Sequence, residues 1–167
     1  MAVTSSGSAK VTLPTDEQIL ITREFDAPRH LVYRAYKTPE LVKRWWSGER
    51  GEVRSAEIDL RVGGTWRYVM VAHGDFEVAF HGEFREIVPD ERIVTTEVYE
   101  MPDAPPLAPE DEPLNIVTFT EVDGRTTLEI LVQTTSKELR DMIVSSGMEV
   151  GMQESLDALE RVAVSLR

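Results

Sequence analysis

Hydrophobic and polar residues alternate along most of the middle of the chain, which is the pattern of half-buried β-strands. A first strand at 17–25 carries apolar residues on both faces near its centre. Short turn sequences join most of the later strands, and Asp123-Gly124 is a strong hairpin signal. The alternation predicts an antiparallel run of six strands, at about 53–60, 64–72, 76–87, 91–99, 114–122 and 125–134.

The spacing of apolar residues changes to a helical period in two places. After the first strand, a short helix is predicted from the spacing of Leu31, Val32, Ala35 and Tyr36, with Asp26 as its N-cap. Thr38-Pro39 then starts a second short helix that leads to the adjacent Trp45 and Trp46. Two short helices therefore separate the first strand from the six-strand run.

The second helical region runs from about 137 to 166, and Ser136 is its expected cap. One apolar stripe along it consists of Met148, Met152, Leu156, Leu159 and Ala163. Gly147 and Gly151 interrupt this region, where each glycine costs about 1 kcal/mol relative to alanine. They either break the helix near residue 147 or allow its backbone to approach the sheet closely.

This order of elements predicts an α+β fold in which a curved antiparallel sheet wraps around a long C-terminal helix. The sheet has one apolar face that requires a cover, and the helix supplies it. Residues 1–16 are small and polar, and we expect a disordered N-terminal tail followed by a single domain at 17–167. Residues 100–113 are rich in proline and acidic residues and are expected to form an extended, solvated loop.

Composition narrows the classes of function. The net charge of -12 and the pI of about 4.7 argue against general binding to nucleic acids or anionic membranes. The absence of cysteine excludes disulfides and thiolate chemistry. No secretory signal or uninterrupted membrane-spanning run is present, so we expect a soluble cytoplasmic protein.

Five segments, in order, resemble the START-like (SRPBCC) superfamily of polyketide cyclases, pollen allergens and lipid-transfer domains. Within it, the chain is similar to the family named after the activator of heat-shock protein 90 ATPase. The segments lie at 25–46, 57–70, 81–97, 117–130 and 147–162. The resemblance implies the helix-grip fold, with a hydrophobic cavity between the sheet and the C-terminal helix. It also implies a link to the stress response.

Two features depart from that family. The family commonly shows Gly-Trp in the last helix, where this chain has Gly151-Met152. The eukaryotic chaperone activators carry a separate N-terminal domain, which the 16-residue tail cannot supply.

Strand parity and the resemblance together give the candidate lining of that cavity. Trp45 belongs to the Trp pair, of which one ring is expected to point inward while the other braces the following turn. Tyr68, Thr95 and Glu97 are the polar members of the set and would orient a ligand. The full candidate set is Trp45, Trp66, Tyr68, Met70, Phe80, Phe84, Thr95, Glu97, Phe119, Met148 and Met152. The alternative is a fully packed interior with no room for a ligand.

The sequence contains no catalytic motif. His30, His73 and His81 lack metal-ligand spacing, and we expect neither a metal nor a cofactor. Parity places His81 on the outer face of the sheet. A carboxylate facing the cavity could act as an acid or base, and Glu86 and Glu97 are the candidates.

Three functions remain open at this stage. The leading hypothesis is a non-enzymatic protein that binds a small apolar, aromatic or lipid-like molecule in the cavity. The second is a cyclase-, dehydratase- or hydrolase-like enzyme that uses a cavity carboxylate. The third is a co-chaperone-like module with a chaperone partner. A homodimer is compatible with each of them.

Overall fold

The computed structural model describes residues 8–74, 76–100 and 107–167. The elements, in chain order, are β1 (Lys10–Thr12), β2 (Gln18–Phe25), α1 (Arg29–Lys37), α2 (Pro39–Val42), β3 (Gly51–Ile58), β4 (Thr65–Ala72), β5 (Phe76–Val88), β6 (Arg92–Thr96), β7 (Val98–Glu100), the 3₁₀-helix η1 (Pro109–Asp111), β8 (Leu114–Val122), β9 (Arg125–Gln133), α3 (Lys137–Ser145) and α4 (Met148–Ser165). None of these helices is long and apolar enough to cross a membrane.

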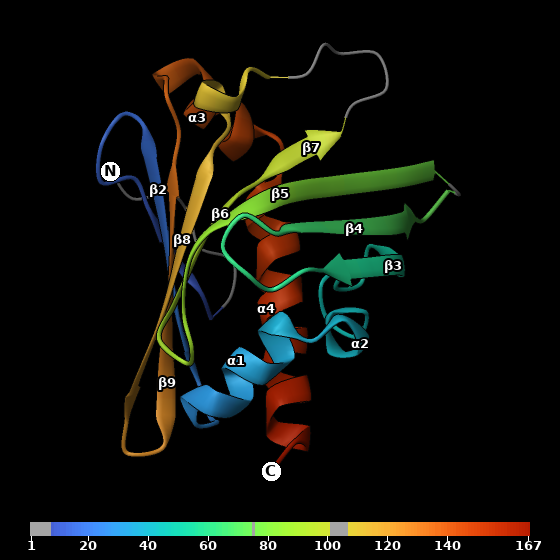
Figure 1. The fold of residues 1–167 in the computed structure, drawn as a ribbon, viewed down its shortest axis with the longest axis vertical. Coiled ribbons are helices and arrows are strands. Elements are labelled where there is room, and N and C mark those ends of the chain that lie inside the picture. The colour runs from blue at the N-terminus through green and yellow to red at the C-terminus, as the bar shows by residue number, and fades with distance from the viewer. Residues whose placement is uncertain (1–7, 75, 101–106) are drawn as a thin grey trace.

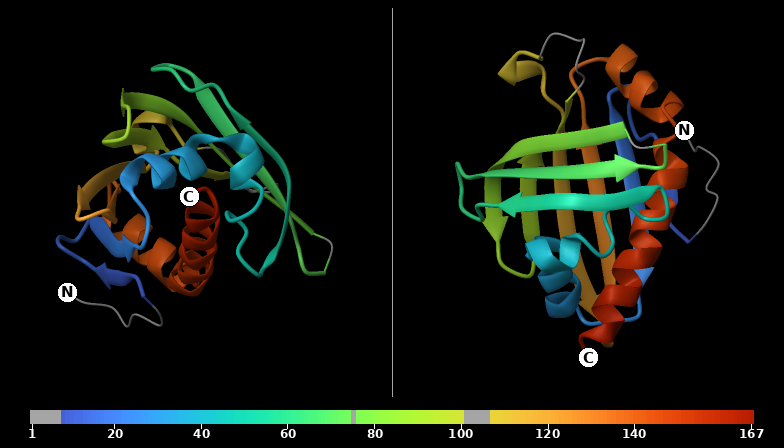
Figure 2. Two further views of the ribbon diagram at one scale, coloured as in Figure 1. Left: turned by 90° about the horizontal axis from the view of Figure 1, so that it is seen from below. Right: turned by 90° about the vertical axis from the view of Figure 1, so that its right-hand side faces the viewer.

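All strand pairs are antiparallel, and the sheet order is β1-β2-β9-β8-β6-β5-β4-β3, with β7 added beside β5. The sheet curves around α4, while α1 and α2 lie across one end of the space between them (Figures 1 and 2). This arrangement confirms the predicted helix-grip fold. The strand predicted at 91–99 is divided, because Glu97 interrupts it between β6 and β7.

The sharp bend of the sheet lies in β5, which pairs with β4 and β7 in its first part and with β6 in its second. The register with β6 shifts between Phe84 and Glu86, as expected for a β-bulge that bends a strand. Just before this shift, a Cβ atom at Gly82 would lie only 1.8 Å from the carbonyl oxygen of Thr96. The glycine therefore permits the close approach of two strands at the bend.

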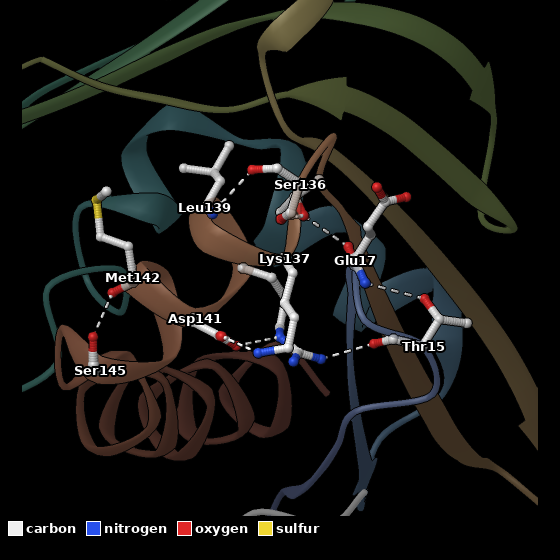
Figure 3. A network of polar contacts seen from close by, with 10 residues as sticks. Thr15, Glu17, Ser136, Lys137, Leu139, Asp141, Met142 and Ser145 are labelled. Carbon is white, nitrogen blue, oxygen red and sulfur yellow. Dashed lines mark hydrogen bonds and ion pairs between the residues drawn. The ribbon is translucent and has the colours of Figure 1, made fainter.

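The C-terminal region is two helices rather than one. Ser136 caps α3 as predicted, because its hydroxyl accepts a 3.1 Å hydrogen bond from the backbone N–H of Leu139 (Figure 3). Gly147 has a φ of 86° and separates α3 from α4. Helices commonly end at a residue with left-handed backbone conformation, which glycine adopts most easily. Gly147 therefore sets the position of the break.

The predicted start of α1 needs correction. Asp26 is not the N-cap of α1: the cap position is Pro28, and the backbone N–H of Arg29 in the first turn donates a 2.8 Å hydrogen bond to Oε1 of Glu121. Instead, the backbone N–H of Asp26 donates a 2.8 Å hydrogen bond to Glu160 of α4. Pro28 precedes α1. Its ring fixes φ, and it has no backbone N–H that would need a hydrogen-bond acceptor.

Part of the segment expected to be a disordered tail is structured. Residues Lys10–Thr12 form β1, and Ala9 and Val11 are buried. The side chain of Gln153 holds this segment against α4, because its Oε1 accepts from the N–H of Ala9 at 2.9 Å and its Nε2 donates to the Ala9 carbonyl at 2.7 Å. Residues 1–7 lie outside the described part of the chain, as do residues 101–106 of the predicted loop.

The main core lies between α4 and the concave face of the sheet. Leu156, Leu159, Val162 and Ala163 of α4 are buried there. On the sheet side, Ile19, Phe25, Phe119 and Leu128 are almost fully enclosed. This core joins the strands β2, β8 and β9 to the helix, and α1 packs on β8 and β9. In the opposite half of the sheet, β3 meets α2, and Trp46 packs on β4 and β5.

Candidate functional site

A hydrogen-bonded polar pair lies inside the fold, where apolar side chains predominate. Glu97 sits between β6 and β7, and Asn115 lies on the adjacent strand β8. The Nδ2 of Asn115 donates a 2.8 Å hydrogen bond to Oε2 of Glu97. The backbone N–H of Glu97 also donates to the carbonyl of Pro113 at 3.0 Å, which fixes the point from which the side chain projects. Both residues line a common pocket.

The pocket draws its walls from both halves of the sheet and from the two short helices. Its volume is about 50 Å³, which is room for roughly three or four water molecules. A drug-sized ligand needs several times that volume. The lining residues are Tyr36, Lys37, Trp45, Trp46, Ile58, Leu60, Trp66, Tyr68, Phe84, Ile93, Thr95, Glu97, Asn115 and Val117.

Trp45 and Trp66 form buried, fixed walls. The indole Nε1 of Trp45 donates to the carbonyl of Ala35 at 2.9 Å, and that of Trp66 donates to the carbonyl of Thr96 at 3.2 Å. These bonds satisfy the polar edge of each ring. The apolar faces of the two rings are therefore available to the pocket without an unsatisfied donor.

Trp46 has a different role from its neighbour. It is partly exposed, and its ring packs edge-on against Tyr68 at 5.4 Å and against Phe80 at 5.3 Å between ring centroids. The two rings were expected to point in different directions. They do so, since Trp45 is buried against α1 and Trp46 packs on β4 and β5. Trp46, however, covers an aromatic surface of β4 and β5 as well as lining the pocket.

Burial dominates the electrostatics of the site. It raises the pKa of Glu97, because an ionised carboxylate loses its hydration there, and the hydrogen bond from Asn115 opposes this only in part. Burial also raises the pKa of Tyr36 and of Tyr68, and the negative charge of Glu97 adds to both shifts. The pocket therefore favours a neutral Glu97 over a wider pH range than water does.

Several polar atoms around the pocket are unsatisfied. The Oδ1 of Asn115 is buried and has no hydrogen-bond partner among the described residues. The hydroxyl groups of Tyr36 and Tyr68 also make no hydrogen bond to any residue in the described part of the chain. Within the same ranges, no lysine, arginine or histidine forms an ion pair with Glu97. A buried polar atom without a partner, such as the Oδ1 of Asn115, requires a water molecule or a ligand.

The candidate residues from the sequence divide into two groups. Six of them line the pocket: Trp45, Trp66, Tyr68, Phe84, Thr95 and Glu97. The remaining five lie elsewhere: Met70 and Phe119 are buried in the core, Phe80 stacks on Tyr99, and Met148 and Met152 are partly buried on α4. The pocket is therefore displaced from the N-terminal half of α4 towards α1 and β8.

Eight lining residues were not among the candidates: Tyr36, Lys37, Trp46, Ile58, Leu60, Ile93, Asn115 and Val117. A signal existed for Asn115, because it has the same strand parity as Phe119, which was expected to face inward. Tyr36 belonged to the recognised apolar stripe of α1. Lys37 lies off that stripe and gave no signal.

The other titratable candidates lie outside the pocket. Glu86 is exposed and pairs with Arg92 at 2.6 Å, because the bulge in β5 reverses the parity that would have turned it inward. His81 bonds to Glu100 at 2.8 Å, and Glu100 also pairs with Arg67. These contacts, that of Arg67 first, lower the pKa of Glu100 to about 2. No group of three or more His, Cys, Asp or Glu side chains within the described ranges could hold a metal ion.

Comparison with solved structures supports the fold. A protein from Rhodobacter sphaeroides superimposes with a TM-score of 0.84 at 20% identity, covering 95% of this chain and 99% of that one. A protein from Arthrobacter aurescens gives a TM-score of 0.82 at 21% identity, with coverages of 93% and 91%. A third, from Mycobacterium smegmatis, gives 0.80 at 22% identity, with coverages of 92% and 94%. These similarities concern the fold alone.

A search of curated proteins returned no match. The family model described as "Activator of Hsp90 ATPase homolog 1-like protein" matches residues 26–163, from the start of α1 to the last turns of α4. The match includes every residue that lines the pocket. The chain belongs to the Activator of Hsp90 ATPase homolog 1-like family.

Proposed function

We propose that the protein binds a small organic molecule in the pocket around Glu97 and Asn115. The observation that carries the proposal is a partly buried polar pair with one buried, unsatisfied acceptor atom, surrounded by aromatic and aliphatic walls. A few convergent polar groups within apolar walls are the usual composition of a ligand site. The apolar walls would supply affinity, and the polar pair would orient the ligand.

The present volume of about 50 Å³ corresponds to a closed form of the site. A cavity of about 150 Å³ is needed to hold a benzene molecule. Binding of a ring therefore requires lining side chains to move. Trp46, Ile58 and Leu60 are the partly exposed apolar members of the lining, so they are the side chains with the least packing to lose.

The test is displacement of an environment-sensitive apolar dye by a library of small aromatic and aliphatic molecules, followed by native mass spectrometry. Ile58→Phe places a larger side chain at the pocket and should weaken binding at least about tenfold. Val62→Phe is the matched control, because Val62 is exposed on the neighbouring turn and does not line the pocket. Equal binding by both variants, or no saturable binding by the native protein, would overturn the proposal.

The position of Glu97 also supports a second candidate, an enzyme that uses this carboxyl as an acid or base. A buried carboxyl with a raised pKa beside two tyrosines is a plausible proton donor. The two candidates differ in what is recovered after incubation. A binding protein returns the ligand with unchanged mass, whereas a cyclase, dehydratase or hydrolase returns a product, and Glu97→Gln should then stop turnover while the fold remains intact.

A further inference from the structure

We propose that the pocket selects organic amines and places their ammonium group against Glu97 within a cage of aromatic rings. The inference rests on the proposed function and specifies the chemical class of its ligand. Three properties of the site carry it: the chemistry of the unsatisfied atoms, the missing counter-ion of Glu97 and the nature of the walls.

Two unsatisfied oxygen atoms at the centre of the site act as acceptors, whereas the nearby hydroxyls of Tyr36 and Tyr68 can donate or accept. The Oδ1 of Asn115 is buried without a partner, and Glu97 uses only one carboxylate oxygen in the hydrogen bond from Asn115. Oxygen atoms of this kind require donors. An ammonium group carries up to three N–H donors and no acceptor, which matches the demand.

Glu97 lacks a cationic partner within the described residues. A buried carboxylate is normally paired with a cation or loses its charge. Lys37 also lines the pocket, but it is not among the groups that shift the pKa of Glu97. Its Nζ lies 6.0 Å from the centroid of Tyr33, a ring that is not part of the lining. The missing positive charge at Glu97 is thus left for a ligand to supply.

The walls are suited to a cation. Six of the fourteen lining residues are aromatic: Tyr36, Trp45, Trp46, Trp66, Tyr68 and Phe84. Aromatic faces attract ammonium groups through the negative charge of the ring face, and a desolvated contact contributes about 2 kcal/mol. The net charge of -12 also concentrates cations near the protein. Aromatic rings around the Glu97 carboxylate would therefore attract an ammonium group both through the ring faces and through the charge of the carboxylate.

The available space fits the charged end of such a ligand. A volume of about 50 Å³ accepts an ammonium group and the first carbon atoms attached to it. The apolar remainder would occupy the room created when the partly exposed lining side chains move.

A matched set of ligands tests the selection. Benzylamine, benzyl alcohol and benzoate share one ring and differ in the polar group. We expect benzylamine to bind at least about tenfold more tightly than either of the others, as measured by the indole N–H signals of Trp45 and Trp66 in NMR titrations. Glu97→Gln should remove this preference, because the amide keeps the shape of the side chain but carries no charge to pair with the ammonium group.

The pH dependence provides a second readout. An ammonium group binds the ionised form of Glu97, so the affinity for benzylamine should rise with pH as Glu97 loses its proton, while the amine stays protonated. A ligand that accepts a hydrogen bond from protonated Glu97 would show the opposite slope. Preference for the alcohol or benzoate, or an affinity for benzylamine that falls with pH, overturns the amine selection but leaves the binding function standing. If none of the three ligands saturates the site, the proposed selection of amines is also overturned. The proposal that the pocket binds a small molecule is then decided by whether other molecules of the library bind.

Discussion

The amide of Asn115 donates a 2.8 Å hydrogen bond to the carboxyl of Glu97, and this pair lies in a pocket with mainly aromatic and aliphatic walls. The two residues come from different strands, since Glu97 separates β6 from β7 and Asn115 lies on β8. Their contact therefore depends on the pairing of β6 with β8, in which Thr95 stands opposite Asn115. The interruption of the strand at Glu97 and the sheet pairing together position the site.

The first prediction concerns the effect of Glu97 on stability. Burial raises its pKa above the ordinary value of 4.5, so the unfolded chain releases this proton at a lower pH than the folded protein does. The cost of Glu97 therefore starts near that ordinary value, grows as the pH rises towards the raised pKa and is constant above it. We expect the stability of Glu97→Gln relative to the native protein to rise with pH above about pH 4.5 and then to level off.

Urea unfolding at a series of pH values measures this effect. Glu86→Gln is the control, because Glu86 is exposed and ion-paired with Arg92. A difference between Glu97→Gln and the native protein that stays constant with pH would show that the carboxyl is not desolvated in the folded state.

The second prediction concerns the bend of β5. Gly82→Ala would place a Cβ 1.8 Å from the carbonyl oxygen of Thr96 and 2.5 Å from Nε1 of Trp66. The nearest contact is a backbone atom that cannot rotate away, so we expect a loss of about 3 kcal/mol or more, at the upper end of overpacking costs. Near-ultraviolet circular dichroism should report the displaced Trp66.

The exposed neighbour Glu83 provides the comparison for this variant. Glu83→Ala should change the free energy of unfolding by less than about 1 kcal/mol, because its ion pair with Arg85 is at the surface. Equal stability of the two variants would contradict the close approach at Gly82.

The third prediction concerns the contact between the N-terminal strand and α4. Gln153→Ala removes both side-chain hydrogen bonds to the backbone of Ala9, and we expect a loss of about 1–3 kcal/mol. Hydrogen exchange of the amides of β1 should accelerate more than that of β9. Val150→Ala, which alters an exposed side chain of the same helix, should leave β1 protected. Unchanged exchange in β1 would show that Gln153 does not hold it.

The fourth prediction concerns the ion pairs of Arg23 with α4, further along this helix. Arg23 is 5% exposed and contacts Asp157 at 2.7 Å and Glu160 at 3.4 Å. Arg23→Ala should cost about 1–3 kcal/mol, less than a fully buried pair because both carboxylates reach solvent. Arg125→Ala breaks the exposed pair with Asp26 and should cost less than about 1 kcal/mol. If Arg23→Ala lost no more stability than Arg125→Ala, the role of Arg23 in anchoring α4 would be contradicted.

The regular parts of the fold could be predicted because their signals are local. Alternation marks a strand wherever one face is buried, and Ser136 marks the start of α3 through its own side chain. The strand β1 escaped prediction because it has three residues and depends on a distant residue, Gln153. Whether Gly147 would break the C-terminal helix could not be decided, since the outcome depends on how the helix packs.

The site was less predictable than the fold for a physical reason. Strand parity predicted that both Glu86 and Glu97 face inward. The bulge in β5 turns Glu86 outward, whereas Glu97, at the interruption between β6 and β7, lines the pocket. Bulges and interruptions arise from long-range pairing, which leaves little trace in the local pattern. The volume of the pocket depends on the side-chain conformations of Trp45, Trp46 and Trp66, which the sequence does not specify.

An NMR titration of the native protein with a library of small aromatic amines, alcohols and acids tests the central claim most directly. The account predicts that the ligand-induced shifts concentrate on the indole N–H groups of Trp45 and Trp66 and on the backbone amides of Glu97 and Asn115. Shifts that concentrate instead around exposed side chains such as Phe76 and Tyr99, or a library that produces no saturable shifts, would contradict it.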